Sequence, residues 1–339
     1  MHTTSVPSVA TTTTAKASGT STTYIPPKAA TVPSHATTAP LVTQTPLPTK
    51  KASYRDPEAV NNELRQNLVN ILCTTKGGGY FQPLSGSGII IGGQGVILTN
   101  AHVAQFFLLR DYLVTDNVDC IVRTGSPATA TYQATLLYLP PAWIAANANQ
   151  IKGGEAVGSG EDDYAFLLIT GRIDGSTQPP SFSNLLFTAD TPDVGEPVVL
   201  DSYPAQFLGG NDIQTNLYAS ASVSTVQKLY TFSSTTKTVD AVSLGNPIVS
   251  QSGSSGGPVA RLTDGALFGI ISTATAGTTT SSRELRAITL AHIDRSLAAY
   301  GQGGLVSFLT SGDLVEKAND FNTNIAPKLS KQLEDVLGN

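Results

Sequence analysis

The stretch SGIIIGGQGVILTNAHV, residues 87–103, decides how this chain is expected to fold. Two apolar runs, 87–91 and 96–99, flank the glycine-rich segment 92–95. Apolar, β-branched runs joined by a short glycine-rich turn are typical of a β-hairpin. The second run ends just before His102, so the pattern predicts a histidine held at the end of a strand, where a rigid scaffold can position it beside a cleft.

A second stretch, Gly253-Ser254-Ser255-Gly256-Gly257-Pro258, places a hydroxyl group on a glycine-flanked turn. Glycine permits backbone dihedrals that a side chain forbids, which leaves the amide groups of Gly253 and Ser255 free to converge on one point. This favours Ser255 as a nucleophile and the two amides as an oxyanion hole. Glycine- and serine-rich turns are also common on surfaces, so an ordinary loop is the alternative.

In this order, the two stretches resemble the trypsin-like serine peptidases, and the bacterial HtrA-type branch more than the digestive enzymes. The resemblance covers about residues 68–299. It implies an all-β fold, a double six-stranded antiparallel β-barrel closed by a C-terminal helix. It also implies hydrolysis of polypeptide substrates with no cofactor and no metal. Further apolar runs separated by turn residues agree with a β-rich chain; they lie at 120–123, 134–139, 197–200, 217–226, 228–232 and 239–244.

The chemistry needs a buried carboxylate that fixes the imidazole tautomer. Asp163 directly precedes the apolar run 164–169 and matches the family's aspartate at the start of a strand, while Asp162 is the rival on the loop side. The resemblance then implies that His102 takes a proton from Ser255 as the serine attacks a carbonyl group, and that water releases the acyl-enzyme. Ser254 stands where relatives often carry asparagine, and we expect its side chain to point away and to be replaceable.

Substrate preference also follows from the resemblance. Val249, Ser272, Thr273 and Ala274 correspond to the family's primary pocket and substrate-pairing strand. None of the four is charged. The sequence therefore predicts a preference for small or apolar side chains before the scissile bond.

Composition excludes several other classes of protein. Only 13% of the 339 residues are charged and the net charge is −5, so no basic face for nucleic acid is expected. The uninterrupted apolar runs are far too short to span a bilayer, and Cys73 and Cys120, the two cysteines, fit no zinc pattern. Both cysteines lie in predicted strands of the same barrel, so either a disulfide or two free buried thiols is expected.

Three regions are expected along the chain. Residues 1–52 are rich in Thr, Ser, Pro and Ala, which predicts a disordered linker or stalk, an extracytoplasmic location and an export segment absent from this sequence. Residues 53–300 form the peptidase domain, with a first helix beginning at Pro57, and too few residues follow for a PDZ module. Residues 301–339 form an amphipathic helical extension that packs on the domain, with a partner or oligomer contact as the alternative.

Two rival functions remain. The glycine-flanked Ser255 also fits the nucleophile elbow of α/β-hydrolase esterases, which would need Asp264 and His292 as partners. Too little chain separates those two residues for the intervening strands and helices, and His292 fits an ordinary helical residue at 288–297. The other rival is a non-catalytic binding module that keeps the peptidase fold.

Overall fold

The computed structural model describes residues 53–76, 84–153, 159–176, 182–235, 237–274 and 284–338. Contacts divide the chain into Met1–Lys50 and Lys51–Asn339, and the described residues belong to the second unit. The linker predicted at 1–52, with His2 and His35, therefore lies outside the described residues.

Six antiparallel strands close into a barrel in the order β1-β2-β3-β6-β5-β4. Their bounds are β1 (Leu68–Thr75), β2 (Leu84–Ile91), β3 (Val96–Thr99), β4 (Val118–Thr124), β5 (Thr129–Tyr138) and β6 (Ala165–Arg172). The predicted hairpin is confirmed, because Ile89 pairs with Leu98 and Ile91 with Val96. The aliphatic side chains of 89–91 and 96–98 are buried, so the hairpin forms one wall of the core.

The second sheet contains seven strands in the order β8-β7-β11-β12-β13-β10-β9. Their bounds are β7 (Pro197–Ser202), β8 (Ser220–Thr225), β9 (Lys228–Tyr230), β10 (Ala241–Ser243), β11 (Pro258–Arg261), β12 (Leu267–Ala274) and β13 (Leu285–Thr289). The edge strands β8 and β9 are separated by only two residues, so the sheet curves round on itself as a half-barrel. The predicted chymotrypsin-like fold class is confirmed, although this sheet has seven strands rather than six, and no pairing joins β8 to β9 in the described chain.

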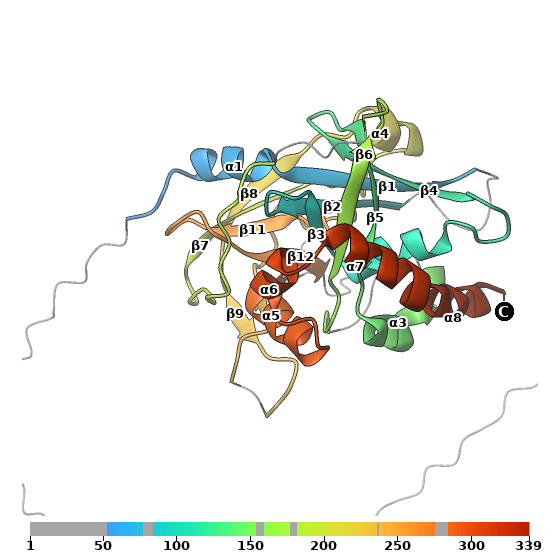
Figure 1. Cartoon of the computed structure of the whole chain (residues 1–339). Helices are drawn as coiled ribbons and strands as arrows, with labels where there is room; N and C mark the ends of the chain where they lie inside the picture. The colour runs from blue at the N-terminus through green and yellow to red at the C-terminus, as the bar shows by residue number, and fades with distance from the viewer. Residues whose placement is uncertain are drawn as a thin grey trace, which may run out of the picture. The chain divides into compact units, whose positions relative to one another are not determined.

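Helices lie before, between and after the strands (Figure 1). Their bounds are α1 (Pro57–Arg65), α2 (Ala101–Ala104), α3 (Pro141–Asn147), α4 (Gly210–Thr215), α5 (Leu290–Ala299), α6 (Leu305–Thr310), α7 (Leu314–Asp320) and α8 (Ala326–Gly338), with shorter helical turns η1 (Gln105–Leu109), η2 (Ala148–Lys152) and η4 (Phe321–Ile325). The helix predicted to begin at Pro57 is confirmed, and Asp56 caps it by accepting from the amide of Glu58. The closing helix predicted near 288–297 is α5.

The two prolines at 140–141 and the Gly-, Ala- and Asn-rich run that follows to Gly160 predict a loop, but the structure forms α3 and η2 over residues 141–152. Pro141 occupies the first turn of α3, where proline is tolerated because its missing N–H would have no helical partner. Trp143 and Ile144 then turn inward and are 4% and 0% exposed. Burial of these two side chains, rather than a long helical pattern, stabilises the helix.

The chain's last helices share the core of the first barrel. Phe308, Phe321, Leu329 and Leu333 belong to the same buried cluster as the β-strand aliphatics. Side-chain hydrogen bonds reinforce this packing, including one from Ser330 Oγ to the carbonyl of Leu108 in η1. Figure 1 shows α7 in front of β5 and β6, and α8 continuing from there to α3. The C-terminal segment thus shares a core with the first barrel. The second sheet adds residues such as Ile270 and Ile288 to the same cluster and has a further cluster of its own.

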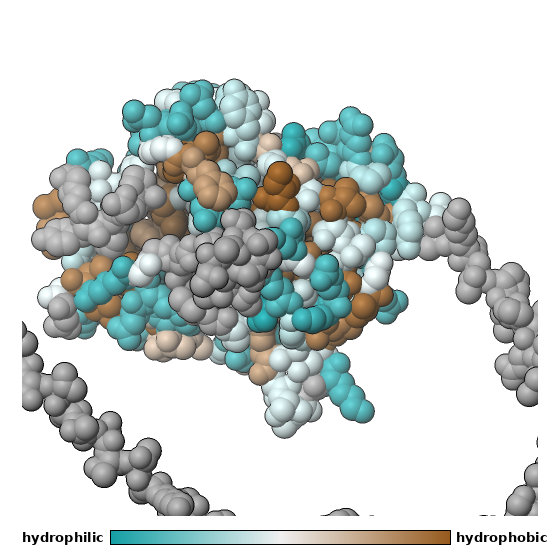
Figure 2. Space-filling model, turned by 180° about the vertical axis from the view of Figure 1, so that it is seen from behind, coloured by the Kyte–Doolittle hydropathy of each residue, from teal (hydrophilic) through white to brown (hydrophobic). Residues whose placement is uncertain are grey.

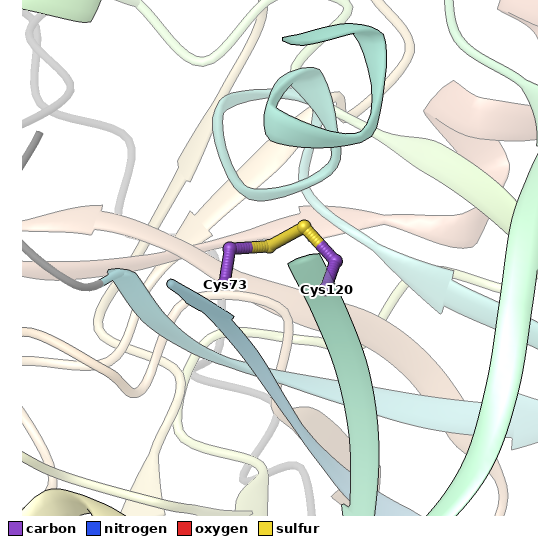
Figure 3. The surroundings of a disulfide bond; sticks show 2 residues. All are labelled: Cys73 and Cys120. Carbon is purple, nitrogen blue, oxygen red and sulfur yellow. A yellow bond between two sulfur atoms is a disulfide. The ribbon is translucent and has the colours of Figure 1, made fainter. Parts of the chain in front are cut away.

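Cys73 of β1 lies directly opposite Cys120 of β4, and a disulfide joins them (Figure 3). The bond connects two adjacent strands of the first barrel, β1 and β4, whose pairing completes the ring of six strands.

Seen from behind, the surface combines hydrophilic residues with separate apolar patches (Figure 2). No helix among the described residues has both the length and the apolar character needed to cross a membrane.

Candidate active site

His102 and Asp163 form a hydrogen-bonded pair within the first barrel. His102 lies in α2, which begins two residues after β3 ends, and its Nδ1 is 2.9 Å from Asp163 Oδ2. Asp163 is 2% exposed and also accepts from the backbone amide of His102 at 3.0 Å. A carboxylate at Nδ1 favours the tautomer with the proton on that nitrogen, which leaves Nε2 able to accept one.

Two neighbouring residues fix the position of Asp163. Asn100 donates from its side-chain amide to the carbonyl of Asp163 at 2.8 Å. Ser272, on β12 of the second sheet, donates to Asp163 Oδ2 at 3.2 Å. Ser272 was predicted on the substrate-pairing strand, and the structure shows that its buried hydroxyl contacts the carboxylate. Both sheets therefore hold this aspartate.

Ser255 lies on a loop that docks against strand β2. The carbonyl of Ser255 accepts from the amide of Ser87 at 2.8 Å, and the carbonyl of Gly253 accepts from the Ser87 hydroxyl at 2.7 Å. Gly253 and Gly256 have φ angles of +94° and +86°, a region that side chains disfavour. A Cβ atom on Gly256 would lie 2.1 Å from the carbonyl oxygen of Ser87. Glycine at this position is what permits the close approach of the two barrels.

The backbone amides of Gly253 and Ser255 donate no hydrogen bond to any residue that the structure describes. Two free amides on one tight loop are the groups that an oxyanion hole requires. Within the same described ranges, no hydrogen bond joins the Ser255 hydroxyl to the ring of His102. Such bonds are often long when no substrate is bound.

Ser254, whose side chain the sequence predicts to point away from the site, lies beneath the loop. It is fully buried, and its hydroxyl accepts from Ser202 Oγ at 3.0 Å. The neighbouring Asp201 is also fully buried and pairs with Arg65 of α1 at 2.8 Å. Burial raises the pKa of Asp201, and the guanidinium of Arg65 opposes that rise. Because Ser254 takes part in this buried polar contact, we now expect its replacement to disturb the loop.

The alternatives weighed from the sequence occupy other places. Asp162 contacts Ser296 and Tyr300 rather than His102. The ring of His292 is hydrogen-bonded to Asp240, and Asp264, the acid that the esterase alternative needs, pairs with Arg261. In the described part of the chain, no hydrogen bond joins His292 or Asp264 to Ser255. The geometry that an esterase elbow would need is therefore not formed by these residues.

Of the predicted substrate-binding residues, Val249 is fully buried in the second sheet's core. Thr273 and Ala274 belong to β12, but their side chains lie outside the described residues.

Among the residues that the structure describes, no group of three or more His, Cys, Asp or Glu side chains is placed to hold a metal ion.

Several of these contacts carry no sequence signal. Ser87, Ser202 and Ser272 each meet their partner across a large separation in the chain, as the hydrogen bonds from Ser87 to Gly253 and from Ser272 to Asp163 show. The one available signal is a polar residue at a strand position that is expected to be buried, since a buried polar group needs a hydrogen-bond partner.

Two antiparallel barrels, with a histidine–aspartate pair on one and a glycine-flanked serine loop on the other, have the architecture of chymotrypsin-like peptidases. The family model described as the trypsin-like peptidase domain matches residues 86–270, more than half of the sequence. The chain therefore belongs to the trypsin-like peptidase family, as its sequence motifs predicted. A search of curated proteins found no match.

Solved structures with a similar fold include two forms of one mycobacterial protease. The active form of the Rv3671c protease from M. tuberculosis is 19% identical, with 77% of this chain and 93% of that chain covered and a TM-score of 0.44. Its inactive form is 20% identical, with coverages of 74% and 98% and a TM-score of 0.43. Deg5 is 16% identical, with coverages of 72% and 94% and a TM-score of 0.47.

Proposed function

We propose that this protein is a serine endopeptidase in which Ser255 is the nucleophile, His102 the general base and Asp163 the acid of the triad. The observation that carries the proposal is the hydrogen bond of 2.9 Å between His102 Nδ1 and the buried carboxylate of Asp163. A carboxylate there orients the imidazole and stabilises the imidazolium that forms when Nε2 takes the serine proton.

The reaction proceeds in two steps. Ser255 Oγ attacks the scissile carbonyl carbon, its proton passes to His102, and the amides of Gly253 and Ser255 stabilise the negative oxygen. The imidazolium then protonates the leaving amine, and an acyl-enzyme forms on Ser255. Water, deprotonated by His102, attacks this ester and releases the second product. The free amides of the loop support this assignment.

Small or apolar side chains are the substrates that this site fits best. The residues assigned to the pocket and the substrate-pairing strand, Val249, Ser272, Thr273 and Ala274, carry no charge. A charged substrate side chain entering such a pocket would lose hydration without gaining an ion pair. Polypeptides with alanine, valine or leucine before the cleaved bond are therefore the substrates to test first.

An extracytoplasmic location is part of the proposal. The disulfide between Cys73 and Cys120 supports it, since disulfides persist in oxidising compartments and are rare in the cytosol. The Thr- and Pro-rich composition of residues 1–52 agrees with a linker between an exported domain and the cell envelope.

Turnover of casein and of short apolar peptides by single and double variants tests the mechanism. Ser255→Ala and His102→Ala are each expected to lower kcat by about 10⁴-fold to 10⁶-fold, and the double variant by no more than the worse single one, because the two groups act as a unit. The exposed Ser307→Ala is the matched control and should keep full turnover. Residual activity close to that of the parent in Ser255→Ala would contradict the proposal.

A further inference from the structure

Asp162, the residue directly before Asp163, is held by helix α5. Its Oδ1 accepts from Ser296 Oγ at 2.7 Å, and its Oδ2 accepts from Tyr300 Oη at 2.6 Å. Ser296 Oγ also contacts Tyr164 Oη at 2.8 Å, so the residue on the other side of Asp163 contacts the same helix. Helix α5 therefore contacts both chain neighbours of the proposed catalytic acid.

The backbone at Asp162 explains why such contacts are needed. Its φ angle is +57°, in the left-handed region that non-glycine residues adopt only at a free-energy cost. The turn that includes it is closed by the amide of Asp163 donating to the carbonyl of Gly160 at 3.1 Å. A conformation of this kind persists only where surrounding contacts hold it. The carboxylate of Asp162 provides those contacts.

His292 completes the group around Asp162. Its Nδ1 is 3.1 Å from Asp240 Oδ1, and its Nε2 faces Asp162 Oδ1 at 3.8 Å. Nε2 is buried and has no hydrogen-bond partner among the described residues. In the neutral ring, with the proton on Nδ1, the lone pair of Nε2 faces a carboxylate oxygen. Protonation turns Nε2 into a donor that Asp162 can accept.

We propose that Asp162 is a positioning residue for Asp163, and that Ser296 of α5 and Tyr300 at its C-terminal end hold the Asp162 carboxylate, with the ring of His292 beside it. These contacts fix the turn that presents Asp163 to His102. The inference rests on the proposed catalytic role of Asp163. Asp162 thus acts through its neighbour and contacts neither the substrate nor the reacting atoms.

Two carboxylates face the ring of His292. Asp240 faces Nδ1 from the segment before β10, and Asp162 faces Nε2 from the turn before β6. Arg295, on α5 itself, donates to Asp240. The ring of Phe232 packs edge-on against the imidazole. Burial opposes ionisation of Asp240, but the amide of Phe232 and the hydrogen bonds from His292 and Arg295 hold the pKa of its carboxyl below the ordinary value.

The first test compares two aspartates with the same backbone conformation. Asp162→Gly keeps the left-handed turn easy to form but removes the carboxylate, and we expect kcat to fall at least 10-fold with KM unchanged. The control is Asp116→Gly, because Asp116 has a φ of +56° but pairs with Arg110 on the exposed surface. Equal kcat for Asp162→Gly and the parent protein would overturn the proposal.

A second variant keeps the test independent of the turn. Tyr300→Phe removes only the hydroxyl that donates to Asp162, and we expect kcat to fall about 5-fold to 10-fold. Tyr230→Phe is the matched control, since Tyr230 donates to Glu284 at 2.8 Å and lies away from Asp163. A fall of the same size in both tyrosine variants would assign the effect to a general loss of packing and overturn the positioning role.

A spectroscopic reading separates failure of this inference from failure of the proposed function. The downfield proton resonance of His102 Nδ1 reports the hydrogen bond to Asp163 whether or not the protein turns over substrate. It should be present in the parent protein and in Asp116→Gly, and broadened or lost in Asp162→Gly. An inactive parent with this pattern would contradict the proposed function alone, whereas an active parent with an unchanged resonance in Asp162→Gly would contradict the inference alone.

Discussion

At the scale of single residues, Gly256 marks where the serine loop meets the first barrel. Its φ angle is +86°, and a Cβ atom there would lie 2.1 Å from the carbonyl oxygen of Ser87. Backbone atoms cannot move aside as a flexible side chain can. The loop that carries Ser255 is therefore in place only because this residue has no side chain.

Gly256→Ala should accordingly lower kcat by about 100-fold or more, because the contact between Ser87 and Ser255 must open to admit the methyl group. The matched control is Gly175→Ala. Gly175 has a φ of +91°, but nothing lies within 4 Å of the added Cβ, so only the backbone cost of about 1 kcal/mol remains. Steady-state kinetics on both variants checks this, and equal kcat values would show that the close approach does not matter.

The sequence predicted the residues that have a local pattern, but it missed the contacts between distant segments. His102 follows an apolar strand, Asp163 precedes one, and the structure brings them within hydrogen-bond distance. By contrast, Ser272 reaches Asp163 across 109 positions of sequence. Such a contact forms only when the two sheets pack together, so no local sequence pattern predicts it.

At the scale of elements, the disulfide joins the first and fourth strands of the closed barrel. Cys73 and Cys120 are 47 positions apart, and β1 also pairs with β4 along six registered residue pairs. A crosslink across such a loop reduces the conformational entropy of the unfolded chain, which stabilises the fold by about 2 to 4 kcal/mol. The crosslink therefore stabilises the barrel that carries both His102 and Asp163.

We expect the double variant Cys73→Ser/Cys120→Ser to lose about 2 to 4 kcal/mol in free energy of unfolding, measured by urea denaturation. Dithiothreitol should lower the midpoint of the parent protein and leave that of the double variant unchanged. A parent protein whose midpoint does not respond to the reductant would show that the bond adds no stability in solution.

Element boundaries followed from the sequence where apolar and turn residues alternate clearly. The hairpin of β2 and β3 is such a case, since the glycine-rich segment 92–95 separates two buried runs. Helix α3 was missed because only Trp143 and Ile144 mark its buried face, and much of its packing comes from α8, almost 200 residues later in the chain. Tertiary contacts of this kind override weak local propensity.

At the scale of the whole molecule, the last helices and the first barrel form one core. Leu333 of α8 is 0% exposed and clusters with the barrel's aliphatic side chains. The amphipathic pattern of residues 301–339 predicted a helical extension against the domain. It did not indicate which barrel would receive it, because many apolar faces have the same spacing.

Leu333→Ala should destabilise the protein by about 2 to 5 kcal/mol, the usual cost of removing a buried leucine side chain. Val315→Ala, at a site that is 59% exposed on α7, should change stability by less than about 0.5 kcal/mol. Thermal unfolding of both variants, followed by circular dichroism, checks the difference. Similar melting temperatures would contradict the shared core.

Labelling by a fluorophosphonate probe, with the modified peptide located by mass spectrometry, tests the central claim most directly. The account predicts label on Ser255 in the parent protein, none on the adjacent Ser254, and loss of label in His102→Ala. Label lost in His292→Ala but retained in His102→Ala would contradict the triad, and a parent protein that takes no label would favour a non-catalytic binding module.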